Sequence, residues 1–417
     1  MTDQDVILQR QAYKLRFKNG DMDFAFNWGL GIGEIIGLSH GEIFNATRNI
    51  KNDNPIEWRK GFIQQAHHAK KRAQAFAASH AAASAGRSNA AAAYAYRAAL
   101  QYADPQDVEF ASLIAEMEAS FQQAMKQLNV PIRPVEIPFE NSSLPGYYLE
   151  IDRKPRPTVV MVGGGDTFRE DLFYFAGYPG WKRDYNVLMV DLPGQGKAPA
   201  SGFTFRVNMA ATIGTCLDWL ESHASVKPTQ IALYGVSGGG YFTAQATASD
   251  SRVNAWIAST PIYDVAEVFR KEFGSALKAP GWAMSLFLKI SARINIGADI
   301  ALNKYAWQFG AKDFKAAIDQ VLIQAQPVDY TKITCPSLLM MGESEAAELK
   351  RQTKVVHADL HQRRVNVTIH EFSALDGADA HCQINNLRLA HDVVFDWLDQ
   401  AFHREQTAQK ADPRIRF

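Results

Sequence analysis

Short apolar runs alternate with helix-length segments through the last two thirds of the chain. Six such runs are bounded by glycine and proline turns, and they span residues 158–162, 186–190, 230–234, 255–258, 337–341 and 365–369. Continuous apolar runs of this length are typical of strands that are buried on both faces of a parallel sheet. Their alternation with helical segments predicts an α/β fold with a mostly parallel, doubly wound sheet and right-handed crossovers.

The first 135 residues or so show a different pattern. From Trp58 to Leu128 strand signals are almost absent, and residues 75–100 are crowded with alanine, the strongest helix former. Prolines at positions 131, 134 and 138 then indicate a boundary between two parts of the chain. We therefore predict a helical N-terminal domain over residues 1–135, followed by an α/β domain over residues 136–417.

The alternation of strands and helices stops between residues 264 and 330. This segment is rich in aromatic side chains, among them Phe269, Trp282 and Trp307, and it contains no strand pattern. Because a structureless loop of this length is uncommon inside a domain, we predict a helical insertion that lies over one edge of the sheet. A final helix is predicted to begin near Asn385 and to bury an apolar stripe.

The composition excludes several classes of protein. The chain has 417 residues with 44 Lys and Arg against 44 Asp and Glu, so no net charge attracts nucleic acid or an anionic membrane. No apolar run approaches about 18 residues, and the first residues lack the pattern of a secretory signal. Three scattered cysteines are too few for a disulfide framework or a zinc cluster. We expect a cytoplasmic protein that needs no metal or cofactor and binds neither nucleic acid nor membrane.

The strongest chemical signal is the sequence Gly235-Val236-Ser237-Gly238-Gly239, which follows an apolar run and precedes a helical pattern. A G-x-S-x-G motif between a strand and a helix is typical of a nucleophile elbow. The sharp turn exposes the serine hydroxyl at the carboxyl edge of the sheet, and the glycines avoid collisions with the neighbouring strand and helix. The alternative is a glycine-rich turn that only joins the two elements.

A nucleophilic serine needs a base to remove its proton and an acid to orient that base, and in this arrangement the acid precedes the histidine in the chain. The apolar run at residues 337–341 is followed by Gly342-Glu343-Ser344-Glu345. The acid normally lies a few residues past such a strand, so we predict Glu345, with Glu343 in reserve. The alternative is an exposed glutamate at a strand end that has no catalytic role.

Eleven histidines are candidates for the base. His381 lies in the loop between the last predicted strand and the last predicted helix, 36 residues after Glu345, which leaves room for one helix and one strand. His391 falls inside the last helix, where a packed or solvated side chain is expected. Most of the others precede the serine or lie in the charged helix after Glu345, so we predict that His381 is the base.

Attack on a carbonyl also requires hydrogen-bond donors for the negative charge that develops on its oxygen. One donor is expected to be the backbone N–H of Gly238, directly after the serine. The other is expected from the glycine run at residues 163–165, after the first central strand, and we predict the N–H of Gly165. A phosphate-binding loop is the alternative, but neither G-x-G-x-x-G nor G-K-[ST] is present. The turn at residues 191–196, after the next strand, is interpreted as structural.

Together these motifs resemble those of the α/β-hydrolase superfamily over residues 136–417. The likeness extends to the regions Tyr96-Arg97-Ala98, Leu144-Pro145-Gly146-Tyr147 before the first strand, and residues 377–383. They are similar to a subgroup with a helical N-terminal cap, which includes 2,6-dihydroxypseudooxynicotine hydrolase and the polyketide-shortening hydrolases of naphthopyrone and anthraquinone pathways. The resemblance implies hydrolysis of a carbon–carbon bond next to a ketone, and a homodimer formed partly through the cap. Some relatives carry an extra acidic residue above the nucleophile, for which Asp264 and Glu267 are candidates here.

We therefore expect a serine hydrolase in which Ser237, His381 and Glu345 cleave a 1,3-diketone or polyketide-like compound through an acyl-enzyme. The flat or bulky apolar substrate is expected between the sheet and the helical segments. The residues expected to contact it are Asp166, Trp28, Tyr94, Tyr96, Phe168 and Trp282. The alternatives are a carboxylesterase, thioesterase or acyltransferase with the same triad, and a binding protein that keeps the fold without the chemistry.

Overall fold

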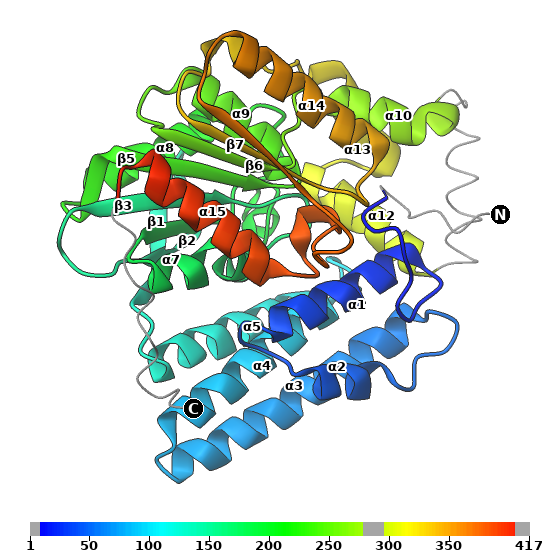
Figure 1. Ribbon diagram of the computed structural model, residues 1–417. Coiled ribbons are helices and arrows are strands. Elements are labelled where there is room, and N and C mark those ends of the chain that lie inside the picture. Colours follow the sequence, from blue (N-terminus) through cyan, green and yellow to red (C-terminus); the bar gives the residue numbers. More distant parts are fainter. Residues whose placement is uncertain (1–8, 278–295, 405–417) are drawn as a thin grey trace.

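The computed structural model describes residues 9–277 and 296–404, and an eight-stranded sheet lies at its centre (Figure 1). The strands are β1 (Ile132–Phe139), β2 (Ser142–Leu149), β3 (Arg156–Val162), β4 (Asn186–Val190), β5 (Val226–Val236), β6 (Ala255–Ser259), β7 (Ser337–Gly342) and β8 (Val367–Phe372). Their order across the sheet is β1-β2-β4-β3-β5-β6-β7-β8. Strands β3 to β8 run parallel, whereas β2 pairs antiparallel with both β1 and β4. The expected mostly parallel α/β sheet is confirmed.

Helices lie on both sides of this sheet. The N-terminal helices are α1 (Gly20–Gly33), α2 (His40–Thr47), α3 (Pro55–Ala78), α4 (Ala82–Leu100) and α5 (Val108–Gln127). Those that follow strands are α6 (Arg169–Leu172), α7 (Tyr178–Lys182), α8 (Ala210–Glu221), α9 (Gly238–Ser249), α14 (Ala347–Gln362) and α15 (Leu387–Ala401). The segment expected to be a helical insertion contains α10 (Val265–Leu277), α12 (Ile296–Phe309) and α13 (Phe314–Gln324). A π-helical turn (Phe173–Gly177) and three 3₁₀ turns (Ala198–Ser201, Tyr330–Lys332 and His381–Gln383) complete the regular structure of the described residues.

The strands β3, β4, β6 and β7 are buried on both faces, as their continuous apolar sequences predict. The edge strand β8 is partly exposed, contrary to the expectation for its apolar run, because no strand of the described residues covers its outer side. In β3, Val159 and Met161 belong to the core shared with the N-terminal helices and α15, because alternate side chains of a strand point to the same face. Val160 and Val162 belong to the core on the other face, where α8 and α14 pack. Figure 1 shows α1 to α5 below the sheet and α9 and α14 above it. The sheet is therefore the middle layer of the molecule.

The long helices α3, α4 and α5 lie side by side beneath the sheet (Figure 1). Helix α3 begins where the Asn54 side chain accepts hydrogen bonds from two backbone N–H groups of the first turn, with Pro55 at the first helical position. Helices α3 and α4 are separated by a short turn in which His80 has a φ of 59°. Trp58 Nε1 donates to the carbonyl oxygen of Ala98 at 2.8 Å and so joins the two helices.

The first two strands of the sheet were not predicted from the sequence. Residues 144–147, expected before the first strand, lie inside β2. The preceding strand β1 is also unexpected because it contains Pro134 and Pro138, but it is an edge strand, where a missing N–H is tolerated. Since β1 begins at Ile132, the sheet begins slightly before the expected domain boundary, and the division into two domains stays a prediction.

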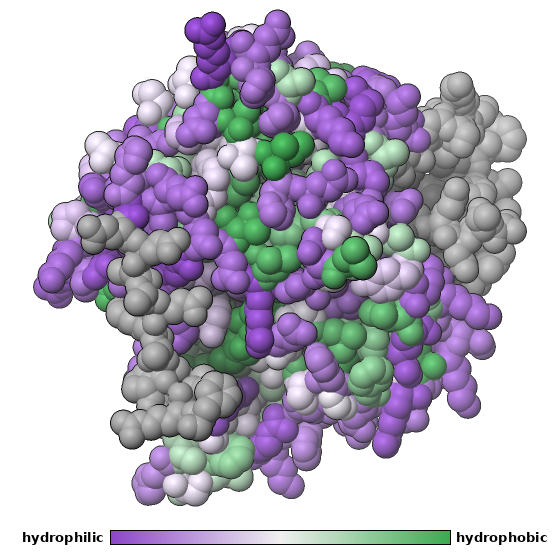
Figure 2. Space-filling model, in the orientation of Figure 1, coloured by the Kyte–Doolittle hydropathy of each residue, from purple (hydrophilic) through white to green (hydrophobic). Residues whose placement is uncertain are grey.

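The visible surface of the molecule is mostly polar (Figure 2). Figure 2 shows polar side chains over most of the visible face, with smaller apolar areas between them. Across residues 9–277 and 296–404, we find no helix with both the length and the apolar character needed to cross a bilayer. Over the same residues, no group of three or more His, Cys, Asp and Glu side chains is placed to hold a metal ion.

Candidate active site

Ser237 lies at a sharp turn between β5 and α9, at the carboxyl edge of the sheet. Its φ of 55° and ψ of −128° are strained for a residue with a side chain. The Ser237 N–H donates to the carbonyl oxygen of Ser259 at 2.6 Å, which holds the turn against β6. A Cβ at Gly235 would lie 2.2 Å from the carbonyl oxygen of Gly239, and one at Gly239 would lie 2.4 Å from that of Val162. The glycines therefore allow the turn to pack against its own helix and against β3.

The predicted acid and base meet at the same edge. Glu345 follows β7 and His381 follows β8, and His381 Nδ1 lies 2.7 Å from Glu345 Oε1 with both side chains buried. Glu343, the reserve candidate, is exposed, and its carboxylate accepts a hydrogen bond from the N–H of Ala374 instead. The geometry thus pairs the histidine with Glu345.

The surroundings of His381 act on the pKa of its ring in opposite directions. Burial alone lowers the pKa of His381, but the adjacent Cys382 and the Glu345 carboxylate outweigh it and raise the pKa above the ordinary value. The Cys382 N–H also donates to Glu345 Oε1 at 3.4 Å, and its Sγ lies 3.5 Å from the carbonyl oxygen of Ser259. A raised pKa makes the imidazole ring a stronger acceptor for a proton.

Ser237 and His381 line one cavity, into which Gly164, Gly165 and Gly238 also face. The structure shows no hydrogen bond between the hydroxyl of Ser237 and the ring of His381, although both residues are described. Such bonds are often long in the absence of substrate and tighten in the reacting complex. Most of the cavity wall is apolar, and its aromatic members include Phe24, Phe175, Phe205, Phe242, Phe269 and Phe309.

The glycine run after β3 packs directly on the serine turn. A Cβ at Gly164 would lie 2.6 Å from Ser237 Cβ and 3.2 Å from the backbone nitrogen of Gly238. A Cβ at Gly238 would lie 3.9 Å from the backbone nitrogen of Gly165. The two amides predicted to hold an oxyanion are therefore neighbours beside the serine.

Two of the residues expected to contact substrate line the cavity, and three do not. Trp28 and Asp166 line the cavity, and Asp166 Oδ2 lies 3.8 Å from Arg10 Nη1. Tyr94, Tyr96 and Phe168 do not line it. Trp282 lies outside the described residues.

The three excluded aromatics are core residues. The ring of Tyr94 packs against Tyr174, that of Tyr96 against His67, and that of Phe168 beneath the guanidinium of Arg97. Their burial in the interior explains the periodic aromatic pattern that the sequence shows. The structure therefore places these three side chains in the core and not in the cavity wall, and their contact with substrate stays a prediction.

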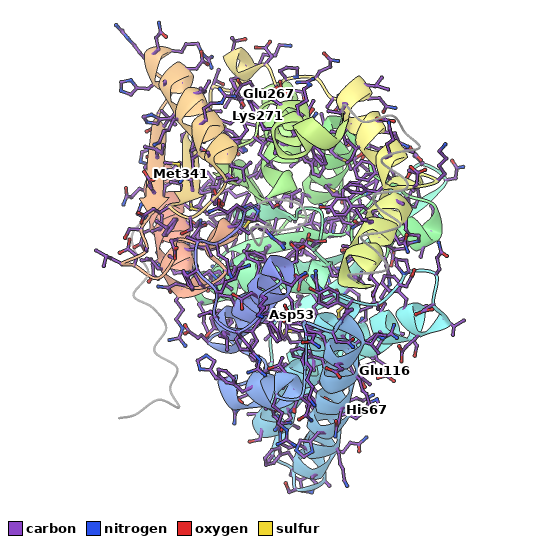
Figure 3. The ribbon with its side chains drawn as sticks, turned by 90° about the vertical axis from the view of Figure 1, so that its right-hand side faces the viewer. Asp53, His67, Glu116, Glu267, Lys271 and Met341 are labelled. Atoms are coloured by element: carbon purple, nitrogen blue, oxygen red, sulfur yellow. The ribbon has the colours of Figure 1, made fainter. Side chains whose placement is uncertain are left out.

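Neither acidic candidate for the position above the nucleophile lines the cavity. Asp264 Oδ1 accepts a hydrogen bond from the N–H of Glu267 at 2.9 Å, in the first turn of α10. Glu267 forms ion pairs with Arg270 and Lys271 on the same helix, and Figure 3 shows Glu267 and Lys271 together on this part of the molecule. These contacts give both carboxylates a structural role at the start of α10.

Several residues around the site were not found by sequence reasoning. The Arg10 guanidinium lies 4.1 Å from the centre of the Phe24 ring, and both side chains line the cavity. The backbone carbonyl of Arg10 accepts a hydrogen bond from the N–H of His381 at 2.7 Å, and that of Gln9 accepts one from Ala346. No motif marks this N-terminal segment, because its backbone hydrogen bonds to the loops of Glu345 and His381 are made with residues more than 300 positions away in the chain.

Comparison with known proteins identifies the family of this chain. A family model described as "Esterase FrsA-like" matches residues 39–271, which is more than half of the chain. The chain belongs to the FrsA-like esterase family. Hydrolyase poxO of Penicillium oxalicum is 26% identical to it over 415 residues, covering 92% of this chain and 98% of that protein. The 20-hydroxy-prefusarin hydrolase FUS2 of Gibberella moniliformis is 26% identical over 422 residues, covering 93% and 97%.

Solved structures show the same fold. The crystal structure of the 2,6-dihydroxy-pseudo-oxynicotine hydrolase matches this FrsA-like protein with a TM-score of 0.67 at 17% identity, over 92% of this chain and 99% of that one. AbyA5 matches with a TM-score of 0.63 at 14% identity, over 88% and 91%. With the esterase family model and the hydrolase relatives, this fold identifies the protein as an enzyme of the α/β-hydrolase type, as its motifs predict.

Proposed function

We propose that this FrsA-like protein is a serine hydrolase that cleaves a carbon–carbon bond next to a ketone through an acyl-enzyme on Ser237. The observation that carries the proposal is the 2.7 Å contact between His381 Nδ1 and Glu345 Oε1, beside Ser237 in one cavity. The preference for a carbon–carbon bond rests on the resemblance of the motifs to those of the capped hydrolases.

In the first half of the reaction, His381 takes the proton of Ser237 while Glu345 keeps the ring oriented and stabilises its positive charge. The serine oxygen adds to a ketone carbon, and the N–H groups of Gly165 and Gly238 stabilise the negative charge on the ketone oxygen. When this adduct collapses, the bond to the carbon between the two carbonyls breaks. The electron pair is held as an enolate by the second carbonyl, and His381 returns the proton to that carbon.

In the second half, a water molecule attacks the acyl-enzyme and gives its proton to His381. The tetrahedral adduct expels the oxygen of Ser237, which regains the proton, and a carboxylic acid leaves. The apolar cavity wall suits a bulky substrate, since burial of apolar surface supplies most of the binding free energy of such ligands.

A second candidate function is cleavage of an ester or thioester, or acyl transfer, by the same residues. The family description as an esterase favours it. The chemistry differs only in the leaving group, which is an alkoxide or thiolate in place of an enolate. Parallel assays with a 1,3-diketone and with aryl esters of the same acyl group separate the two functions by their kcat/KM values.

The experiment that tests the nucleophile uses a fluorophosphonate probe, which forms a covalent bond to an activated serine. We expect the wild-type protein to be labelled at Ser237 and Ser237→Ala to lose both labelling and hydrolysis. Ser249→Ala, at the exposed end of α9, serves as the control and should behave as wild type. Full turnover by Ser237→Ala contradicts the proposal.

We also propose that the protein forms a homodimer partly through its N-terminal helices and works in the cytoplasm. Exposed apolar side chains on those helices, such as Phe44 on α2 and Val108 on α5, support a contact there. Sedimentation velocity at micromolar concentration should give twice the chain mass of 46.3 kDa, and a monomer contradicts the dimer.

A further inference from the structure

Gln195 lies in the turn between β4 and α8 that the sequence marks only as structural, and its side chain is 1% exposed. We propose that Gln195 is a positioning residue that fixes the direction of the Gly165 N–H, and thereby builds half of the oxyanion site. This inference rests on the proposed function and adds to it a residue that does not touch the substrate.

The Gln195 side chain reaches from its own turn to the glycine run after β3. Its Nε2 donates to the carbonyl oxygen of Gly163 at 2.5 Å and to that of Gly164 at 3.0 Å. Its Oε1 accepts a hydrogen bond from the N–H of Leu192 at 3.2 Å. The amide therefore has one favourable orientation, because a flip would place Oε1 against two carbonyl oxygens.

The bond to Gly164 determines where the next N–H points. The carbonyl of Gly164 and the N–H of Gly165 belong to one peptide unit, which is planar and trans, so the two groups point in opposite directions. While Gln195 holds the carbonyl on one side, the N–H of Gly165 is directed to the other. Gly165 lines the cavity there, next to Gly238.

The glycine run cannot hold this direction by itself. Three successive glycines have no side chains to pack and populate many backbone conformations, so ordering them has a high entropic cost. Two further contacts hold the ends of the run. Gln308 Nε2 on α12 donates to the carbonyl oxygen of Gly165 at 2.5 Å, and the N–H of Gly196 donates to that of Thr167 at 3.1 Å. Thr167 Oγ1 also donates to the carbonyl oxygen of Gly164, at 3.3 Å. Among the described residues, however, only the Gln195 side chain bonds to the carbonyls of both Gly163 and Gly164, so its amide fixes the backbone on either side of the Gly164 Cα.

This role predicts a specific kinetic signature. A preorganised donor stabilises the charge that appears in the transition state and has little effect on the uncharged substrate. Loss of the Gln195 amide should therefore lower kcat and the rate of phosphonylation of Ser237, with KM unchanged within about threefold. A merely structural glutamine would instead affect the melting temperature and leave these rates unchanged in the folded protein.

The test uses Gln195→Glu, which keeps the shape but cannot donate when ionised, and Gln195→Met, which removes both polar atoms. Gln230→Glu is the matched control, since its Nε2 also donates to a backbone carbonyl, that of Phe402, at 2.8 Å and away from the cavity. Reaction with a fluorophosphonate and hydrolysis of p-nitrophenyl butyrate are measured, together with the Ki of an alkyl boronic acid that forms a tetrahedral adduct on serine.

For either folded Gln195 variant we expect both rates to fall about 10- to 100-fold and the boronate Ki to rise by a similar factor, while Gln230→Glu matches wild type. Circular dichroism identifies which variants are folded. Wild-type rates and Ki in a folded Gln195 variant overturn the positioning role alone. Failure of the probe to label wild-type Ser237 overturns the proposed function, so the two failures are distinct.

Discussion

Arg97 Nε donates to Asp171 Oδ2 at 2.7 Å, and the two side chains are only 4% and 1% exposed. Arg97 comes from α4 among the N-terminal helices and Asp171 from α6, which follows β3 and packs in the core that the sheet shares with those helices, so the pair joins the helical region to the sheet region. Arg97 Nη2 also donates to the carbonyl oxygen of Asp166 at 2.6 Å, directly after Gly165. The helical region and the glycine run are thus connected through one guanidinium group.

Removing one partner of this buried pair should strongly destabilise the fold. Arg97→Met leaves the Asp171 carboxylate in the interior without its counter-charge, and we expect the free energy of unfolding to fall by about 3–5 kcal/mol. Arg59→Met is the control, because Arg59 pairs with the half-exposed Asp107 and should change stability by less than about 1 kcal/mol. Urea denaturation followed by circular dichroism measures both. Equal effects for the two variants contradict the prediction.

The two glutamates after β7 should differ sharply in their effect on catalysis. Glu345→Gln keeps the size of the side chain but removes the charge that stabilises protonated His381, so we expect kcat to fall by about 10³- to 10⁴-fold. Glu343→Gln changes an exposed carboxylate and should leave kcat within about twofold of wild type. Steady-state kinetics on an aryl ester at saturating substrate measures the effect. A larger loss in the Glu343 variant would assign the acid to the other residue.

His391 should make the fold sensitive to mild acid. Burial lowers its pKa from 6.5 to about 4, although its Nε2 lies 2.6 Å from the carbonyl oxygen of Tyr174. Because the unfolded chain then binds a proton at higher pH than the folded one, the stabilisation is complete above pH 6.5 and is lost as the pH falls toward 4. The full loss from this residue is about 3 kcal/mol. In His391→Gln, the free energy of unfolding should depend less on pH over this range, as urea titrations at several pH values will show.

Lys304 should behave as a buried cation that destabilises the protein at neutral pH. Burial lowers the pKa of Lys304 from 10.5 to about 8, and its Nζ has no hydrogen-bond partner within residues 9–277 and 296–404. Below pH 8 the amine is charged in both the folded and the unfolded chain, so the penalty of burying the charge is complete. That penalty disappears as the pH rises from 8 toward 10.5.

Lys304→Met removes this charge, and at pH 7 we expect it to be more stable than wild type by up to about 3 kcal/mol. The difference should shrink toward pH 10.5, where wild-type Lys304 is neutral in the folded state. Thermal and urea unfolding at pH 7 and pH 10 test this. A difference that does not change with pH would mean that packing, and not charge, accounts for it.

The sequence allows the sheet and the catalytic candidates to be predicted because both follow from local pattern. Buried parallel strands require continuous apolar runs, and the serine turn requires its glycines. Glu345 and His381 could then be chosen because the carboxyl ends of parallel strands meet at one edge. These predictions need no knowledge of which distant segments touch.

The cavity wall could not be predicted in the same way. Tyr94, Tyr96 and Trp28 look alike in the sequence, since an aromatic residue on a helix has the same pattern whether it faces a core or a cavity. Arg10 belongs to no motif, and its place beside the cavity depends on contacts with Phe24, Asp166 and His381, which come from three separate parts of the chain. Gln195 was interpreted as part of a turn, and only the contacts of its amide reveal a further role.

The N-terminal segment has a consequence for how the site responds to proteolytic trimming. The backbone carbonyls of Gln9 and Arg10 accept hydrogen bonds from the N–H groups of Ala346 and His381, in the loops that carry the predicted acid and base. Cleavage after residue 10 would remove both acceptors, so these loops would lose two of the contacts that fix them although every catalytic side chain is retained.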